Sequence, residues 1–471
     1  MKLYQKFRNS SLDTSPLGIV SGSNVSGSVY TPAGSRIVAW VNGTDVHFCQ
    51  VEGFGETVFS VDSAAPPGDC IHPVAHSLLD FIGLVAICKD ASLIYQAYQW
   101  SRCRFQEQIA AIKPGIKMQS VLRALQNTYH PTAISDPYGY ILSIQQSFDY
   151  STIPLHPDYF EWCPIRPGML KWEVGFETAF AGHCEPGHAG QELALRRSFR
   201  WNGERWTVPA VYLCENGIVI DYYLEVPGAA MEKFMNQWGS RIGQPMSIED
   251  ELRCKLENPL AVENHESLTV NSYPTPIKSG FTLTWNPKTD NGWNARRVLD
   301  YYGLDREKGY LLRRACFLRK SNLPPVRDMS LALVAEPVSI PGQRFIAPRP
   351  GESMTFEHPV TGYTHRLTVT AQNRESLNPN FLSDHPSCYT RMAFSLDPPL
   401  NKEQFSVVDC DPGDAYPGGP DSRAEISLQG KIPTVGHFAV SSLRYTPAEQ
   451  IQWRMEFRQK LRQDVTIPLL P

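Results

Sequence analysis

The chain has 471 residues, of which 42% are apolar and 20% are charged, and its formal net charge is −4. This length exceeds one ordinary hydrophobic core, so two or three domains are expected. With an isoelectric point near 6.3, the chain lacks the basic field that general nucleic-acid binding or attachment to an anionic membrane needs. Neither partner is therefore expected.

The cysteines and the apolar runs predict the cellular compartment. Eleven cysteines are spread singly along the chain, without a Cys-x-x-Cys pair. The first residues, Met1–Arg8, lack the apolar stretch of a secretion signal. The longest apolar run, Phe81–Cys88, has eight residues and is too short to span a bilayer. We therefore expect a cytoplasmic protein with reduced thiols and no membrane-spanning segment.

Residues 1–155 are expected to form an N-terminal α+β domain. The first part, 1–35, is rich in Ser and Gly and should be extended or partly disordered. Alternation of apolar residues then predicts strands, and the run 81–88 fits either a buried strand or a short helix. Helical spacing follows it, which gives strands and then helices within one domain. The expected strands are 37–41, 45–51 and 56–62, and the expected helices are 101–112, 118–129 and 137–148.

Three Asn-Gly pairs lie between alternating apolar segments, at 42–43, 202–203 and 216–217. Such pairs are typical of tight hairpin turns, because a type I′ turn needs positive φ at both central residues. The last two pairs predict a three-stranded antiparallel meander over 195–224. A two-residue turn at Asn202-Gly203 places Phe199 opposite Trp206.

The meander should belong to a module over 156–275, which also holds two helices and a linker. Apolar spacing predicts a helix over 231–238, and Ser247 to Asp250 resembles a capping box in front of a second one. The polar, Pro-broken stretch 258–280 is expected to be the linker.

Residues 276–471 are expected to form a C-terminal β-sandwich. The segment 451–458 alternates strictly, which predicts a strand with one buried face. Similar segments recur at the spacing of a sandwich. The fold class predicted for the whole chain is therefore β-rich α+β, with an N-terminal α+β domain followed by antiparallel β-sandwich modules.

The densest run of metal-ligand residue types is 183–188. His183, Glu185 and His188, with Cys184 between them, offer imidazole, carboxylate and thiolate groups that zinc accepts. Pro186-Gly187 prevents a helix, so the two histidines cannot share a helix face. A metal site on a turn and an ordinary polar loop are both compatible with this run.

His358 and His365 flank a Pro-Val-Thr-Gly loop. If His358 faces Tyr363 across that loop, Phe356 faces His365, and alternation places both histidines on one face of a hairpin. They would then be diagonal neighbours about 7–8 Å apart. Such a pair fits half of a metal or acid–base site, or two edge histidines bonded to loop backbone.

Asp409, Asp411 and Asp414 form an acidic turn whose oxygens suit Ca²⁺, but the EF-hand pattern is absent, so a solvated acidic loop is the alternative. The chain contains no Gly-x-Ser-x-Gly and no nucleotide-binding loop. No particular cofactor is therefore predicted.

Two functions fit these observations. The first is a non-catalytic binding or scaffold protein that recognises a protein or carbohydrate ligand. The alternative is a β-sandwich hydrolase, with or without a metal, acting on a carbohydrate or another small substrate. Its site would lie among His183, Glu185, His188, His358 and His365.

Overall fold

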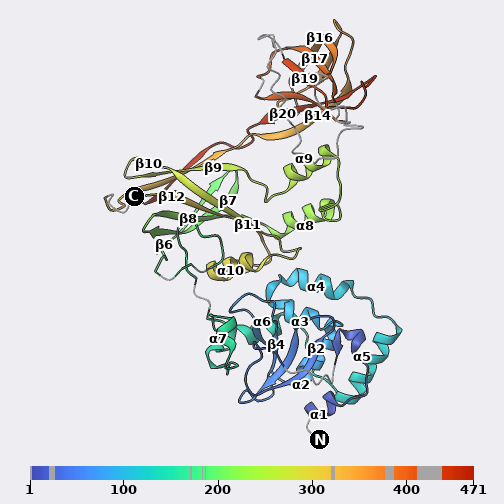
Figure 1. Ribbon diagram of the computed structural model, residues 1–471, viewed down its shortest axis with the longest axis vertical. Helices are drawn as coiled ribbons and strands as arrows, with labels where there is room; N and C mark the ends of the chain where they lie inside the picture. The colour runs from blue at the N-terminus through green and yellow to red at the C-terminus, as the bar shows by residue number, and fades with distance from the viewer. Residues whose placement is uncertain are drawn as a thin grey trace. The chain divides into compact units, whose positions relative to one another are not determined.

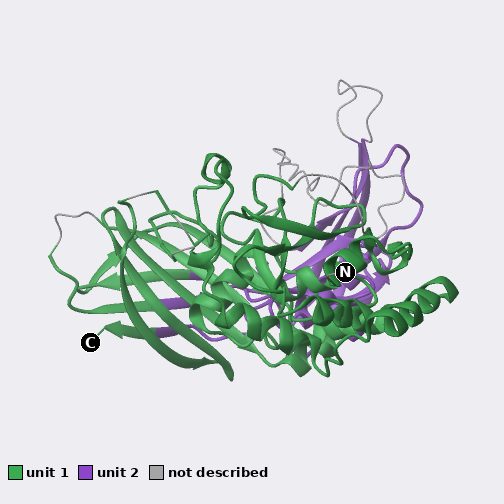
Figure 2. Cartoon of the chain, turned by 90° about the horizontal axis from the view of Figure 1, so that it is seen from below, with its two compact units in different colours: residues 1–235, 266–331, 467–471 green, residues 236–265, 332–466 purple. Residues whose placement is uncertain are grey.

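The computed structural model describes residues 3–20, 27–169, 172–182, 184–185, 187–319, 324–376, 387–401, 403–410 and 437–470. The chain divides into two compact units, coloured green and purple in Figure 2. The first unit comprises Met1–Met235, Glu266–Leu331 and Ile467–Pro471, and the second comprises Asn236–His265 and Ala332–Thr466. The three domains expected from the sequence (1–155, 156–275 and 276–471) stay a prediction.

The first unit begins with an antiparallel sheet whose strands pair in chain order, drawn in blue in Figure 1. Its strands are β1 (Ile19–Val20), β2 (Ser35–Val41), β3 (His47–Val51), β4 (Val58–Val61) and β5 (Ile71–Ala75). The helices around it are α1 (Leu3–Arg8), η1 (Ser15–Leu17), α2 (Leu78–Cys88), α3 (Ser92–Gln96), η2 (Ala97–Gln99), α4 (Arg102–Ala111), α5 (Ile116–Tyr129), α6 (Pro137–Ser147), η3 (Tyr150–Thr152) and α7 (Tyr159–Trp162). The N-terminal α+β architecture is thereby confirmed.

The apolar run 81–88, which fitted either a strand or a helix, lies in helix α2, and an N-cap residue favours the start of this helix. The Ser77 hydroxyl accepts a hydrogen bond from the Asp80 amide, which satisfies one of the free N–H groups of α2. The helix buries its apolar residues against the sheet, where the rings of Phe48 and Phe81 lie 4.6 Å apart between centroids.

Residues 3–20 differ from the extended or disordered segment that was expected. They form α1, η1 and β1, and they bury the side chains of Phe7, Leu17 and Ile19 in the first core. Three large apolar groups within a Ser-rich segment are enough to dock it, because each buried side chain of this size contributes roughly 1.5–3 kcal/mol.

The second sheet of the first unit contains the predicted meander and two later strands. Its order is β11-β12-β8-β7-β6. The pairing of Phe199 with Trp206 is confirmed, and Asn202 and Gly203 both have positive φ, as a type I′ turn requires. The strands and associated helices are β6 (Gln191–Trp201), β7 (Glu204–Cys214), β8 (Gly217–Val226), β11 (Ile277–Trp285), β12 (Gly309–Leu318), α8 (Gly228–Trp238) and α10 (Trp293–Tyr302).

The second turn of the meander differs from the expected type I′ turn at Asn216-Gly217. Cys214 pairs with Gly217, so the turn residues are Glu215 and Asn216, and positive φ occurs at neither. Gly217 is needed for packing, because a Cβ atom there would overlap the ring of Phe176 and a backbone carbonyl of β12.

The stretch 258–280, expected to be a linker, contains three strand segments. β9 (Asn264–Val270) and β10 (Tyr273–Thr275) form a hairpin whose turn residues, Asn271 and Ser272, both have positive φ. Asn271 tolerates this conformation well, which is the turn signal that the sequence reading overlooked. The sheet order is β10-β9-β13-β21, with β13 (Met329–Ala335) and β21 (Val465–Leu470).

The second unit contains α9 (Ile248–Glu257) and two antiparallel sheets that share one core, which confirms the β-sandwich. Trp453 and Phe457 come from one sheet, and Phe356, Leu367 and Met392 come from the other. One sheet contains β14 (Val338–Ile346), β20 (Gln452–Gln459) and β18 (Phe405–Asp409). The other contains β15 (Ser353–Glu357), β16 (Thr364–Ser376), β17 (Cys388–Asp397) and β19 (His437–Val440).

Strand β20 is buried on both faces, not on one as its alternation predicted. Its polar positions include Arg454 and Glu456, which are 1% and 6% exposed and form an ion pair of 2.6 Å. Charged residues at alternate positions therefore do not show that this face of β20 is exposed. Two charges that pair can be buried, whereas a single charge cannot.

Two further features concern the cysteines and the lengths of the helices. All eleven cysteines lie in the described part of the chain, and each has a free thiol. Within the described ranges, no helix combines the length and the apolar character needed to cross a bilayer.

Candidate functional site

A cavity of about 530 Å³ lies in the first unit, where the first sheet region meets helix α10. One wall comes from β5, η2, α6 and η3, and the other comes from α10 and the residues that follow it. The polar side chains that line it include His72, Tyr98, Gln145, Tyr150, Arg296 and Arg306. Residues more than 140 positions apart in the sequence therefore build one site.

Local structure positions the two walls. Every residue of β5 is buried, so His72 is held in a strand with little freedom. Helix α10 ends at Gly303, whose φ of 63° lets its N–H return to the carbonyls of Leu299 and Asp300. Arg296 and Asp300 lie one turn apart on α10, which places both side chains on the same face.

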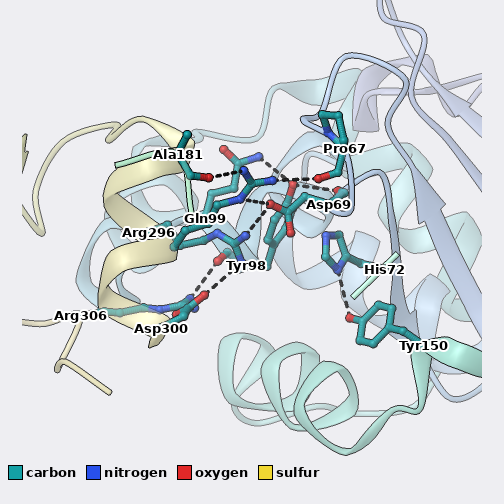
Figure 3. A network of polar contacts seen from close by, with 11 residues as sticks. Pro67, Asp69, His72, Tyr98, Gln99, Tyr150, Ala181, Arg296, Asp300 and Arg306 are labelled. Atoms are coloured by element: carbon teal, nitrogen blue, oxygen red, sulfur yellow. Dashed lines mark hydrogen bonds and ion pairs between the residues drawn. The ribbon is translucent and has the colours of Figure 1, made fainter. Parts of the chain in front are cut away.

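Figure 3 shows Arg296 of α10 beside Asp69 of the first sheet region. Arg297 binds the same carboxylate. Arg296 Nη2 lies 2.7 Å and Arg297 Nε lies 3.0 Å from Oδ2 of Asp69. Arg297 also donates to the carbonyl of Pro67 at 2.9 Å. Burial is the largest single influence on Asp69 and works to raise its pKa. The neighbouring positive charges, Arg296 foremost, and the hydrogen bond from Arg296 together outweigh burial and lower the pKa, so Asp69 is ionised at neutral pH.

The same network continues along α10. Asp300 accepts from Arg296 Nη1 at 3.1 Å and from Arg306 Nη2 at 2.5 Å. Arg306 Nη1 donates to the carbonyl of Tyr98 at 2.8 Å, which ties the end of α10 to η2. Three arginines thus meet two aspartates, which leaves one positive charge uncompensated within this network.

His72 lies beside this network with its imidazole in an aromatic setting. Its Nδ1 is 3.0 Å from the hydroxyl of Tyr150, and its ring packs on Tyr98 at 4.0 Å between centroids. The guanidinium of Arg296 lies 5.0 Å from the centre of the same Tyr98 ring. Burial lowers the pKa of His72 to about 4, so the imidazole is neutral at pH 7.

Three side chains that line the cavity carry a buried nitrogen with no hydrogen-bond partner among the described residues. These atoms are Nε2 of His72, Nε2 of Gln145 and Nε of Arg296. His72 and Arg296 are only 7% and 9% exposed. A buried polar atom left unpaired costs about 1–3 kcal/mol, so three around one cavity need an explanation.

The predicted histidine pair lies elsewhere, in the second unit. Phe356 pairs with His365, and the His358 amide donates to the carbonyl of Tyr363. Both contacts agree with the prediction made from the alternation of side chains. Both imidazoles are buried, with ring centroids 6.2 Å apart.

The ring nitrogens of the two histidines differ in their roles. Nδ1 of His358 accepts the amides of Val360 and Thr361, so its proton lies on Nε2. Nδ1 of His365 donates to the carbonyl of Pro398 at 2.9 Å, which leaves a lone pair on Nε2. In this arrangement only His365 offers a free lone pair to a metal.

The other predicted ligands do not converge in the described residues. Glu185 and His188 are 3.6 Å apart, with side chains 86% and 60% exposed, and His183 lies outside the described residues. Asp409 binds Arg444 at 2.8 Å, while Asp411 and Asp414 also fall outside. Across the described ranges, three or more His, Cys, Asp or Glu side chains do not gather to hold a metal ion. The metal site stays a prediction.

Sequence reasoning missed the cavity. His72 is a single polar residue in an apolar strand, and such residues are usually structural. Helix α10 carried a usable signal, because Arg296 and Arg297 precede Val298 and Leu299 directly, so charged residues occupy part of its buried side. Buried arginines need carboxylate partners, but the sequence does not reveal which ones.

Known proteins do not add to this description. No protein-family model, no curated protein and no solved structure matches the chain.

Proposed function

We propose that this protein is a non-catalytic binding protein whose ligand is a small molecule held in the cavity between β5, α6 and α10. One observation carries the proposal: three buried nitrogens that lack hydrogen-bond partners in the described part of the chain belong to side chains that line the same cavity. A ligand with complementary atoms, together with small rotations of these side chains, would remove the cost of leaving them unpaired.

The composition of the walls supports a ligand site. The volume of about 530 Å³ lies within the range of roughly 300–1,000 Å³ that is usual for small-molecule pockets. Leu142, Leu299 and Leu304 supply apolar surface, and the remaining lining side chains are mostly polar or charged. Such a mixture gives affinity through burial and orientation through hydrogen bonds.

The regions of the chain that carry the two walls are also joined by hydrogen bonds outside the cavity lining. The Ser101 hydroxyl donates to the carbonyl of Pro287 at 2.5 Å. The carboxylate of Glu307 accepts the amides of Arg102 and Cys103, at the start of α4, at 2.6 and 3.1 Å. A cavity that is already organised loses less entropy on binding, which favours affinity.

The test is a fragment screen by ligand-observed NMR, followed by calorimetry of the fragments that bind. We expect Leu142→Phe, which fills part of the cavity, to weaken binding at least tenfold. The control is Leu122→Phe, at a half-buried leucine on α5 that does not line the cavity. Equal affinity of the native and Leu142→Phe proteins for every fragment, or no binding at all, would contradict the proposal.

The alternative, a metal-assisted β-sandwich hydrolase, is favoured by one observation. The donation from His365 Nδ1 to the carbonyl of Pro398 is the orientation found in metal-binding histidines. Elemental analysis of the purified protein tests it: a stoichiometric transition metal that is lost in His365→Ala would favour this second function.

A further inference from the structure

The charge of the cavity wall limits which ligands it can hold. Arg296, Arg297 and Arg306 are balanced by only two carboxylates, Asp69 and Asp300. Arg296 is 9% exposed, so this charge is poorly solvated. A ligand with one negative charge would complete the network, whereas a cationic ligand would add to the imbalance.

The unpaired atoms point to the same kind of ligand. Nε of Arg296 can only donate, and the amide nitrogen of Gln145 can only donate. If the Tyr150 hydroxyl donates to Nδ1 of His72, the imidazole carries its proton on Nε2 and is a third donor. Small rotations of these side chains would bring the buried nitrogens to the cavity surface, where they call for a ligand rich in acceptor oxygens. Charge-assisted hydrogen bonds to such oxygens are about twice as strong as neutral ones.

The rest of the lining indicates what the ligand carries beyond its charged group. Leu142, Leu299 and Leu304 line the same cavity from α6 and from α10 with the residues after it. They suit a short hydrocarbon or aromatic body.

We infer that the ligand is a small organic monocarboxylate, whose carboxylate lies near Arg296, His72 and Gln145 and whose apolar body lies against the three leucines. This inference rests on the proposed function and specifies its ligand. A phosphate dianion shares the oxygen chemistry, but it brings more charge than this network leaves uncompensated.

The experiment compares matched probes by isothermal calorimetry in a buffer free of carboxylate and phosphate. The carboxylates are isovalerate and phenylacetate, and their neutral isosteres are isovaleramide and phenylacetamide. Inorganic phosphate and phenyl phosphate are the second anionic arm. We expect at least one carboxylate to bind ten times or more tightly than its amide and more tightly than either phosphate.

Two test variants and one control variant locate the binding site. Gln145→Glu changes a half-buried donor into an acceptor with a negative charge, and it should weaken carboxylate binding at least tenfold. Gln126→Glu adds the same charge on an exposed position of α5 and should have no effect. His72→Phe keeps a ring against Tyr98 and removes the donor, so it should weaken carboxylate binding about fivefold or more.

The outcomes separate this inference from the proposed function. Equal binding of carboxylates and amides, or tighter binding of phosphates, would overturn the monocarboxylate while the cavity remained a ligand site. Loss of carboxylate binding in Gln126→Glu as well as in Gln145→Glu would also overturn it. If carboxylates fail but other fragments bind in a manner sensitive to Leu142→Phe, only the ligand class is wrong. If no compound binds, both proposals are wrong.

Discussion

Arg314 and Asp221 face each other on the neighbouring strands β12 and β8 and form a two-point ion pair, with nitrogen–oxygen distances of 2.7 and 2.8 Å. Their side chains are 0% and 2% exposed. The hydroxyl of Tyr302 donates to the same carboxylate at 2.7 Å, and the ring of Phe180 lies 4.5 Å from the guanidinium carbon. The interior of the second sheet therefore contains a charge pair whose hydrogen bonds are well satisfied.

Removing one partner of this pair should be costly. We expect Arg314→Met and Asp221→Asn each to lower the free energy of unfolding by about 3–5 kcal/mol, because the remaining group stays buried without its partner. The double variant should lose less than the sum of the two. Urea denaturation monitored by tryptophan fluorescence measures all three.

The control for this prediction lies on the same sheet. Arg205 is largely exposed and lies 3.8 Å from Glu225, so Arg205→Met should cost no more than about 1 kcal/mol. If Arg314→Met were as mild as Arg205→Met, the buried pair would not contribute as its geometry indicates.

Stability should depend on pH through His72. The pKa of its imidazole is about 4 in the folded chain, lowered by burial, against about 6.5 for an exposed histidine. Between these values the unfolded chain binds a proton that the folded chain does not, so stability falls as pH drops from 6.5 to 4. The slope is up to about 1.4 kcal/mol per pH unit.

Unfolding of native protein and of His72→Phe at pH 7 and pH 5 checks the sign. The variant should lose less stability between the two pH values than the native protein, whatever its stability at pH 7. His76→Phe, at an exposed imidazole just after β5, is the matched control variant. A steeper loss in His72→Phe would show that the imidazole is charged when folded.

Comparison of the structure with the sequence shows which contacts local patterns could predict. The pairing of Phe199 with Trp206 follows from local turn chemistry and alternation, so it could be predicted. Strands β12 and β8 pair although residues 227–308 separate them in the chain, and no local pattern indicates that contact. The partnership of Asp69 and Arg296, 227 positions apart, was hidden for the same reason. The sequence therefore indicated the fold class but not the cavity.

His358 should contribute to the stability of the fold mainly through its hydrogen bonds to the loop that follows it. Its Nδ1 accepts the amides of Val360 and Thr361, as the side-chain oxygen of Asn or Asp does in many turns. We expect His358→Ala to lower the free energy of unfolding by about 1–3 kcal/mol and His358→Asn to recover part of it. Equal stability of the two variants, measured by thermal denaturation, would show that these hydrogen bonds contribute nothing.

Glu307 caps a helix that lies about 200 residues before it in the sequence, since its two oxygens accept the first amides of α4. Glu307→Ala should cost about 1–3 kcal/mol, because a charged acceptor at a helix N-terminus is lost. Glu107→Ala, on the exposed side of the same helix, should cost less than about 1 kcal/mol. Hydrogen exchange at the start of α4 should rise only in the first variant.

The cysteines provide a chemical test. All eleven have free thiols in the structure, and Cys49, Cys88 and Cys316 are buried. Titration of unfolded, unreduced protein with a thiol reagent should count close to eleven reactive groups. Two or more stable disulfides would contradict the prediction of a reducing, cytoplasmic compartment.

The dependence of Asp69 on Arg296 and Arg297 has a consequence for synthesis on the ribosome. The strands of the first sheet and helix α6 are complete by residue 147, long before α10 leaves the exit tunnel. Until then Asp69 has no guanidinium to offset the cost of burying its carboxylate. The charge pairing of Asp69 in the folded chain therefore becomes possible only late in synthesis.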